Sequence, residues 1–187
     1  MSLTSEHVKK WFKEVVLPNT NKDSVLLLDS WSGQNSNILE NIERDGMGPK
    51  ILTIPAGTTG MVQPLDVFFF RPYKSFFRKF SDSVMLYNLD LNLHVRNNII
   101  QLHSQVFNQF CSPRFENLIK YAWFKSGYVD ERPPEFANPI EFCFNTCNPI
   151  CDFCDVIAII RCAWCAKSFC FDHFYKSFHY CKHFCVT

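Results

Sequence analysis

The stretch IPAGTTGMVQPLDVFFFRPYKSFF, residues 54–77, places one acid, Asp66, between a Gln-Pro pair and a basic segment crowded with phenylalanine. Residues 50–54, which end at the first residue of this stretch, form a short apolar run that predicts a buried strand. The same pattern occurs upstream at residues 24–28, which end directly before Asp29. Each acid therefore follows a predicted strand. We expect a strand–helix–strand unit with parallel pairing, in which both strands are covered on both faces.

Helical patterns surround this unit and give the fold class α/β. Thr4 is the expected N-cap of an amphipathic helix that ends before Pro18, and a later helix begins or is interrupted around Pro72. Another helix lies between Ser112, its N-cap, and Gly127, its terminator. The predicted helices cover residues 4–16, a crossover segment with Glu40, Ile42 and Gly46, and residues 66–80, 95–110 and 112–127.

The composition predicts a globular chain. Its 187 residues are 47% hydrophobic and include 20 phenylalanines, which is enough for one core and a small additional module. No run approaches the roughly 18 apolar residues of a membrane span, and the polar segment after Met1 does not read as a secretion signal. A net charge of +1 means that any DNA contact must come from a local basic patch.

Asp29 and Asp66 are candidate ligands of a divalent cation. In an open α/β sheet, positions after the strand ends converge on one crevice. Two carboxylates there can hold Mg²⁺ or Mn²⁺, which activate water for attack on phosphate. The alternative is that both are ordinary turn or cap residues, and spacing alone favours that alternative by about two to one.

The segments VLLLDSWSGQ and ILTIPAGTTGMVQPLDVFFFRPYKSFFRKF resemble the DDE superfamily endonuclease domain of the pogo and Tigger-like branch. The resemblance is specific over residues 24–80 and extends to about residue 142. It implies a partial RNase H-like fold followed by helices, DNA as partner and a nuclear location. Asp29 would be the second catalytic acid and Asp66 the third. The residues that would shape the approach to the helix are Thr58, Thr59, Gln63 and Pro64.

The chain departs from the family pattern in two places. Gln34 stands where many relatives have histidine. The first acid of the trio should lie on a strand well upstream of Asp29, but the acids found there are Glu6, Glu14 and Asp23, and none suits that role. We therefore expect a chain that begins midway through the domain, binds Mg²⁺ or Mn²⁺ weakly, and cleaves little or no DNA. An acid supplied by another chain would instead make an active Mg²⁺ nuclease.

A basic segment follows Asp66. Its cations could contact DNA phosphates or could simply be a solvated helix face, and the pattern favours neither. The nearby phenylalanines, 68–70 and 76–77, are predicted to lie in the core. His94 and His103 are predicted to lie either on a helix face or in the core. Cys111 is expected to be a buried apolar residue. The candidate phosphate contacts are Arg71, Lys74, Arg78 and Lys79.

Nine of the ten cysteines come after residue 142. From residue 151 the order is Cys-x2-Cys, Cys-x2-Cys, Cys-x2-His and His-x-Cys, four close pairs that match two tetrahedral zinc sites. A disulfide framework is the alternative, but it requires an oxidising compartment. With all eight positions filled by protein, about two zinc ions would be structural. The candidate ligands are Cys151, Cys154, Cys162, Cys165, Cys170, His173, His179 and Cys181.

The pairing of these ligands is open on spacing alone. The pattern is similar to the RING-like cysteine-rich domains at the end of some transposases, which implies a cross-brace of the first with the third pair and the second with the fourth. Sequential pairing is the alternative. The spare ligands are Cys143, Cys147, His183 and Cys185, of which Cys147 could replace Cys151.

We thus predict a DDE domain with its helical extension at residues 1–129, a linker at 130–146 and a zinc module at 147–187. The expected function is DNA binding, with the ancestral endonuclease chemistry lost. The competing function is a zinc-dependent protein-interaction module on a decayed transposase scaffold, in which a protein partner binds the module.

Overall fold

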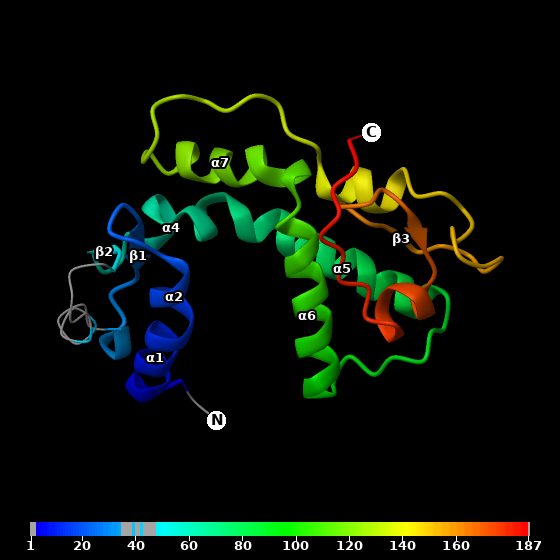
Figure 1. The fold of residues 1–187 in the computed structure, drawn as a ribbon, viewed down its shortest axis with the longest axis horizontal. Coiled ribbons are helices and arrows are strands. Elements are labelled where there is room, and N and C mark those ends of the chain that lie inside the picture. The colour runs from blue at the N-terminus through cyan, green and yellow to red at the C-terminus, as the bar shows by residue number, and fades with distance from the viewer. Residues whose placement is uncertain (1–2, 35–38, 40–41, 43–47, 187) are drawn as a thin grey trace. The chain divides into compact units, whose positions relative to one another are not determined.

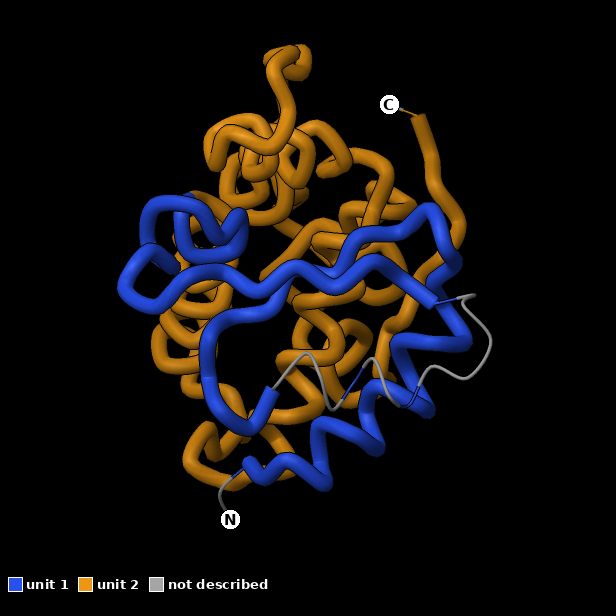
Figure 2. The backbone as a smooth tube through the Cα atoms, turned by 90° about the vertical axis from the view of Figure 1, so that its left-hand side faces the viewer, with its two compact units in different colours: residues 1–67 blue, residues 68–187 orange. Residues whose placement is uncertain are grey.

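The structure is a computed structural model of the 187-residue chain, in which residues 3–34, 39, 42 and 48–186 are described. The chain forms two compact units, residues 1–67 and 68–187 (Figure 2). The predicted crossover helix around Glu40, Ile42 and Gly46 falls largely outside the described residues. Each unit is described by itself below.

Unit 1 opens with a continuous helical segment. Thr4 is its N-cap, as predicted, and forms a capping box with His7. The prediction that the helix ends before Pro18 is wrong. Pro18 lies within the last helical piece, so the helical segment continues past it to Asn19. The elements of unit 1 are α1 (Ser5–Trp11), the π-helix η1 (Phe12–Val16), α2 (Leu17–Asn19), β1 (Val25–Leu28), the 3-10 helix η2 (Ser32–Gln34), β2 (Lys50–Thr53) and α4 (Thr59–Val62).

The strands β1 and β2 pair in parallel, in a register that runs from Val25 opposite Lys50 to Leu28 opposite Thr53. This confirms the predicted parallel pairing. The prediction that both strands are covered on both faces is wrong, because Val25 and Leu52 remain 48% and 39% exposed. Among the described residues, the helical segment packs on the strands through the small core of unit 1, which consists of Val8, Phe12, Val16, Leu28 and Leu39.

Unit 2 is mainly helical, with one short antiparallel strand pair (Figure 1). The predicted cap and terminator of its α7 region are confirmed. The Ser112 side chain accepts a hydrogen bond from the Arg114 backbone, and Gly127 has a positive φ of 78°. The π-helix η3 (Leu65–Phe69) precedes α5 (Phe70–Leu86), α6 (Arg96–Phe110), the 3-10 helix η4 (Pro113–Phe115), α7 (Glu116–Lys125), the π-helix η5 (Glu141–Asn145), β3 (Ile160–Arg161), β4 (Ser168–Phe169) and the π-helix η6 (Asp172–Lys176).

The core of unit 2 joins the helices to the cysteine-rich segment. Phe76 and Phe110 from the helices are fully buried in the same cluster as Ile160 and Phe174 from the segment. The predicted phenylalanine core is therefore found, but it is shared with the module. The division into domains at 130–146 stays a prediction about sequence modules, since the compact units separate at a different place.

Cys111 corrects another expectation. It is exposed at the C-cap of α6 and not buried. The buried face of α6 carries Leu102, Val106 and Phe110, and the next residue along a helix points about 100° away from such a face. Throughout the part of the chain that is described, none of the helices has the length and apolar character needed to cross a membrane.

Candidate metal centres

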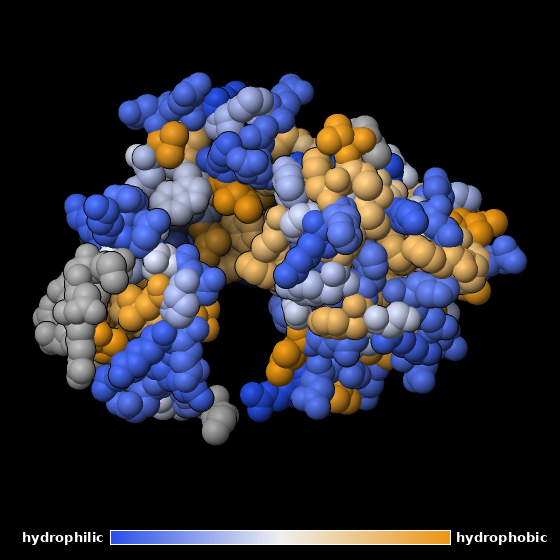
Figure 3. Space-filling model, viewed as in Figure 1, coloured by the Kyte–Doolittle hydropathy of each residue, from blue (hydrophilic) through white to orange (hydrophobic). Residues whose placement is uncertain are grey.

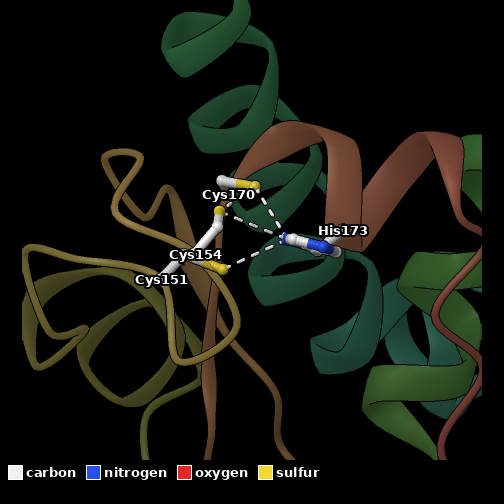
Figure 4. Close-up of side chains that lie close together, drawn as sticks. All are labelled: Cys151, Cys154, Cys170 and His173. Atoms are coloured by element: carbon white, nitrogen blue, oxygen red, sulfur yellow. Dashed lines mark hydrogen bonds between the residues drawn. The ribbon is translucent and has the colours of Figure 1, made fainter.

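The first candidate centre gathers side chains from three segments of unit 2. Cys151 and Cys154 lie in the loop before β3, Cys170 directly follows β4, and His173 lies in the first turn of η6. Their ligand atoms all lie within 4.8 Å of one another and point toward a common centre (Figure 4). The turn of the first pair is closed by the Cys151 backbone N–H, which donates to the carbonyl of Val156.

The separations fit a tetrahedral metal ion. The His173 Nδ1 atom lies 3.4, 3.5 and 3.3 Å from the sulfurs of Cys151, Cys154 and Cys170, respectively. The sulfurs of Cys154 and Cys170 are 3.7 Å apart. Zinc–sulfur and zinc–nitrogen bonds of about 2.3 and 2.0 Å give tetrahedron edges of roughly 3.5 to 3.8 Å. A zinc ion therefore fits between these four atoms with little movement.

Hydrogen bonding favours the thiolate form of one cysteine of this centre, Cys151. Burial raises the pKa of the Cys151 thiol, but hydrogen bonds with the backbone of Cys170 and Phe153 and with the His173 side chain lower that pKa to about 6. Zinc binds cysteine in the deprotonated form. The lowered pKa favours the deprotonated form of Cys151, which is the form that a metal ion binds.

The second candidate centre consists of Cys162, Cys165, His179 and Cys181, whose ligand atoms also lie within 4.8 Å of one another. The first two residues occupy the turn between β3 and β4, which Ala166 closes with a positive φ of 58°. The Cys165 sulfur is 3.8 Å from His179 Nε2. A hydrogen bond between Cys162 and Cys165 lowers the pKa of Cys162. The same hydrogen bond raises the pKa of Cys165 to about 12.

The structure groups the eight residues in the cross-braced way and not in sequence order. Cys151, and not Cys147, lies in the first group. Cys147 is half-buried outside it, and Cys143 is fully buried in the core of unit 2. Two Cys₃His groups with no open position could hold structural metal ions.

Sequence reasoning missed how α6 holds the cysteine-rich segment. Three polar side chains on its buried face bond to the backbone of the segment. The Gln105 amide donates to the Phe174 carbonyl at 2.5 Å, and the Gln109 side-chain oxygen accepts from the Ala163 N–H at 2.7 Å. Asn108 donates to the Cys181 carbonyl at 3.1 Å. The only feature of the sequence that could have indicated these bonds is the presence of three amide side chains within five consecutive residues of α6.

Asp29 and Asp66 both lie in unit 1. Asp29 is half-buried directly after β1, and its carboxylate accepts a hydrogen bond from the Trp31 N–H at 3.1 Å. The Trp31 ring lies against Gly33, where a Cβ atom would collide with it. Asp66 is exposed in η3, and its N–H donates to the carbonyl of Gln63 at 3.0 Å. Among the described residues, neither acid belongs to a cluster of three or more potential metal ligands, and the pairing of the two at one metal stays a prediction.

The predicted phosphate contacts lie on α5. All four side chains are exposed, and among the residues that the structure describes none of them forms an ion pair. Spacings of three, four and one along a helix place them on one side of it. We call this set, Arg71, Lys74, Arg78 and Lys79, the basic row.

His103 of α6 lies beside the helix that carries the basic row. It stacks on Phe77 with ring centroids 4.6 Å apart, and its Nδ1 atom is 3.0 Å from the Tyr73 hydroxyl. His103 is thus a ring-packing residue on a helix face, one of the two places expected for it.

Two family models match the chain. The DDE superfamily endonuclease model matches residues 1–127, and the Tc5 transposase C-terminal domain model matches residues 123–181, which include both cysteine–histidine groups. No curated protein and no solved structure matches the chain. The first model covers more than half of the sequence, and the second covers the cysteine-rich segment. The chain is therefore a transposase-related protein that belongs to the DDE superfamily endonuclease family.

Proposed function

We propose that this protein binds DNA in the nucleus through the basic row on α5, and that zinc in the two cysteine–histidine groups stabilises unit 2. The single observation that carries the proposal is the basic row itself. It presents four exposed cations, without acid partners among the described residues, on the helix that follows the Asp66 motif of a DDE-family chain. Unpaired cations on one helix face are suited to neutralising DNA phosphates.

The fold of unit 1 is compatible with part of an RNase H-like domain. Its parallel strand pair leads to Asp29 at the end of β1, and Asp66 follows β2 after a turn and a short helix. The turn is held by Thr58, whose hydroxyl donates to the Pro55 carbonyl at 2.8 Å. We propose that Asp29 and Asp66 correspond to the second and third acids of the family.

Cleavage is not part of the proposed function of this chain. The other described acids of unit 1 are engaged or placed elsewhere. Glu6 pairs with Lys9 at 2.6 Å and Glu14 lies 4.0 Å from Lys10, both along the first helical segment. Two carboxylates supply too few ligands to fix the two ions of phosphoryl-transfer chemistry. Mg²⁺ or Mn²⁺ should accordingly bind weakly at this pair.

The test is salt-dependent binding of a labelled DNA duplex to the zinc-loaded chain. Each phosphate contact contributes about 0.9 to the slope of log affinity against log salt concentration. Lys74→Gln should reduce that slope by about one phosphate contact. Lys125→Gln is the matched control, because Lys125 is also exposed, lies outside the basic row and forms no ion pair among the described residues.

The outcome separates a binding surface from a solvated helix face. If Lys74→Gln and Lys125→Gln change the slope equally, or if the unaltered chain binds DNA without salt dependence, the basic row is not the DNA-binding surface. A variant with both Arg71→Gln and Arg78→Gln should lower the slope more than Lys74→Gln does, because it removes two cations from the same face and not one.

A further inference from the structure

An exposed apolar surface lies where the end of α5 meets the loop before β3. Leu86 and Tyr87 are 76% and 44% exposed on the helix side. Ile150, Val156 and Ile157 are 54%, 58% and 55% exposed on the loop side, and Ile150 and Ile157 pair through an isolated β-bridge. Figure 3 shows hydrophobic residues at the right of the view, where Figure 1 places the region of β3. We call these five residues the apolar patch.

Two cavities open at the apolar patch. One, of about 380 Å³, is lined by Tyr87, Val156 and Ile157 above the buried residue Phe171. The other, of about 430 Å³, is lined by Leu86, Tyr87 and Ile157. Tyr87 and Ile157 line both cavities, so the cavities adjoin each other, and we call the two together the groove. Exposed apolar side chains around adjoining cavities are typical of a binding surface.

The charge around the groove indicates what could bind there. The two segments that supply the apolar patch, residues 85–90 and 148–157, contain three aspartates and no lysine or arginine. These acids, Asp90, Asp152 and Asp155, are all exposed. Two lysines also line the cavities. Lys176 is paired with Asp172 at 2.9 Å, and Lys79 belongs to the basic row. The borders supplied by the patch segments are therefore acidic.

This charge argues against a second copy of the chain as the occupant. In a two-fold symmetric contact the same surface faces itself, so the three aspartates of one copy would approach those of the other. Like charges at a contact oppose association. A partner with lysine or arginine beside its apolar residues would meet the aspartates favourably.

We propose that the apolar patch binds a basic amphipathic segment of another protein. Its aliphatic side chains fill the two cavities between Tyr87 and Ile157, and its cations face Asp90 and Asp155. This inference goes beyond DNA binding and does not depend on it, because none of the five residues of the apolar patch belongs to the basic row. Lys79 of the basic row lines the second cavity, but Lys74, which tests DNA binding, lines neither cavity. It also identifies which face of the module would receive a protein partner.

The test uses the full zinc-loaded chain and a fluorescent synthetic peptide helix with leucine on one face and lysine on the other. Binding is measured by fluorescence anisotropy. A matched peptide with glutamate in place of lysine should bind about tenfold more weakly or worse, because it opposes the aspartates. The lysine peptide should also lose affinity as salt concentration rises.

Substitutions locate the binding site. Ile157→Lys should reduce affinity for the lysine peptide by about tenfold or more, since it places a cation in the groove. Ile100→Lys is the matched control, because Ile100 is 54% exposed on α6 and Ile157 is 55% exposed. If Ile157→Lys also loses zinc, Leu86→Lys on α5 provides the same test away from the metal ligands.

Two results would overturn the proposal. The first is that Ile157→Lys and Leu86→Lys bind the lysine peptide as well as Ile100→Lys does. The second is that the chain forms a dimer in solution that dissociates in the Leu86→Lys variant, which would make a second copy the occupant. Asp90→Asn should weaken peptide binding more than Asp130→Asn, in which an exposed aspartate outside the groove is changed.

Discussion

Gln109 of α6 offers the sharpest test of how unit 2 is held together. Its side-chain oxygen is the hydrogen-bond acceptor for the Ala163 N–H, and both residues are fully buried. Ala163 follows Cys162 of the second candidate metal centre directly. Replacing Gln109 by methionine keeps the volume of the side chain but leaves the Ala163 N–H without an acceptor.

Gln105, one helical turn away, is the matched control. Its amide donates to the Phe174 carbonyl, which also accepts from the His179 N–H at 2.9 Å. Gln105→Met therefore leaves that carbonyl with one bond. Each substitution also removes one buried polar atom without a partner, the side-chain oxygen of Gln105 or the side-chain nitrogen of Gln109, so this contribution cancels in the comparison. A buried donor left unsatisfied costs about 1–3 kcal/mol, whereas a carbonyl that keeps one bond loses well under that.

We expect Gln109→Met to destabilise unit 2 by about 1–2 kcal/mol more than Gln105→Met. Native-state hydrogen exchange, read by mass spectrometry on peptides from residues 158–176 of the zinc-loaded chain, measures the opening free energy of this region. The difference corresponds to roughly a five- to thirtyfold faster exchange in Gln109→Met. Equal effects, or a larger effect of Gln105→Met, would refute the assignment of the Gln109–Ala163 bond as the stabilising contact.

Further predictions concern the metal, the core of unit 1 and the acids. Cys165→Ser should lower the bound zinc from about two ions per chain to about one, as measured by elemental analysis, and an unchanged count would contradict the second centre. Phe12→Ala should destabilise unit 1 by about 3–5 kcal/mol in urea denaturation without loss of zinc, because Phe12 is fully buried in the unit 1 core. With Mn²⁺ and a nicked or linear duplex, the chain should show no cleavage. Cleavage that disappears in Asp66→Asn would show that its metal site is complete.

Features set by neighbouring residues could be predicted from the sequence. The caps at Thr4 and Ser112 depend on hydrogen bonds within three residues, and Gly127 ends α7 because it adopts a positive φ. The close cysteine and histidine pairs were visible for the same reason, since each short turn is defined by its own spacing. Their division into two groups required a resemblance, because spacing does not decide which pairs meet.

Features that depend on distant residues were missed. An amide on a helix usually reads as solvent-facing, so nothing in the sequence identified Gln105 and Gln109 as buried partners of backbone groups more than 50 residues away. Cys111 was misplaced because cysteine is commonly buried, whereas its position at the end of α6 decides its exposure. The burial of β1 and β2 was overestimated because an apolar run in the sequence does not indicate whether one face of the strand or both faces are covered by other elements.

The bonds between α6 and the cysteine-rich segment also set an order of events during synthesis. The hydrogen-bond partners of Gln109 and Gln105 lie 54 and 69 residues further along the chain, so they are synthesised later. At roughly 5–20 residues per second, a ribosome needs about 3 to 14 seconds to make that interval. Until then the part of α6 that contacts the cysteine-rich segment is exposed to water and to other nascent chains. Unit 2 must therefore close after translation of its last segment, at a stage when chaperones and the supply of zinc determine how much of the protein folds.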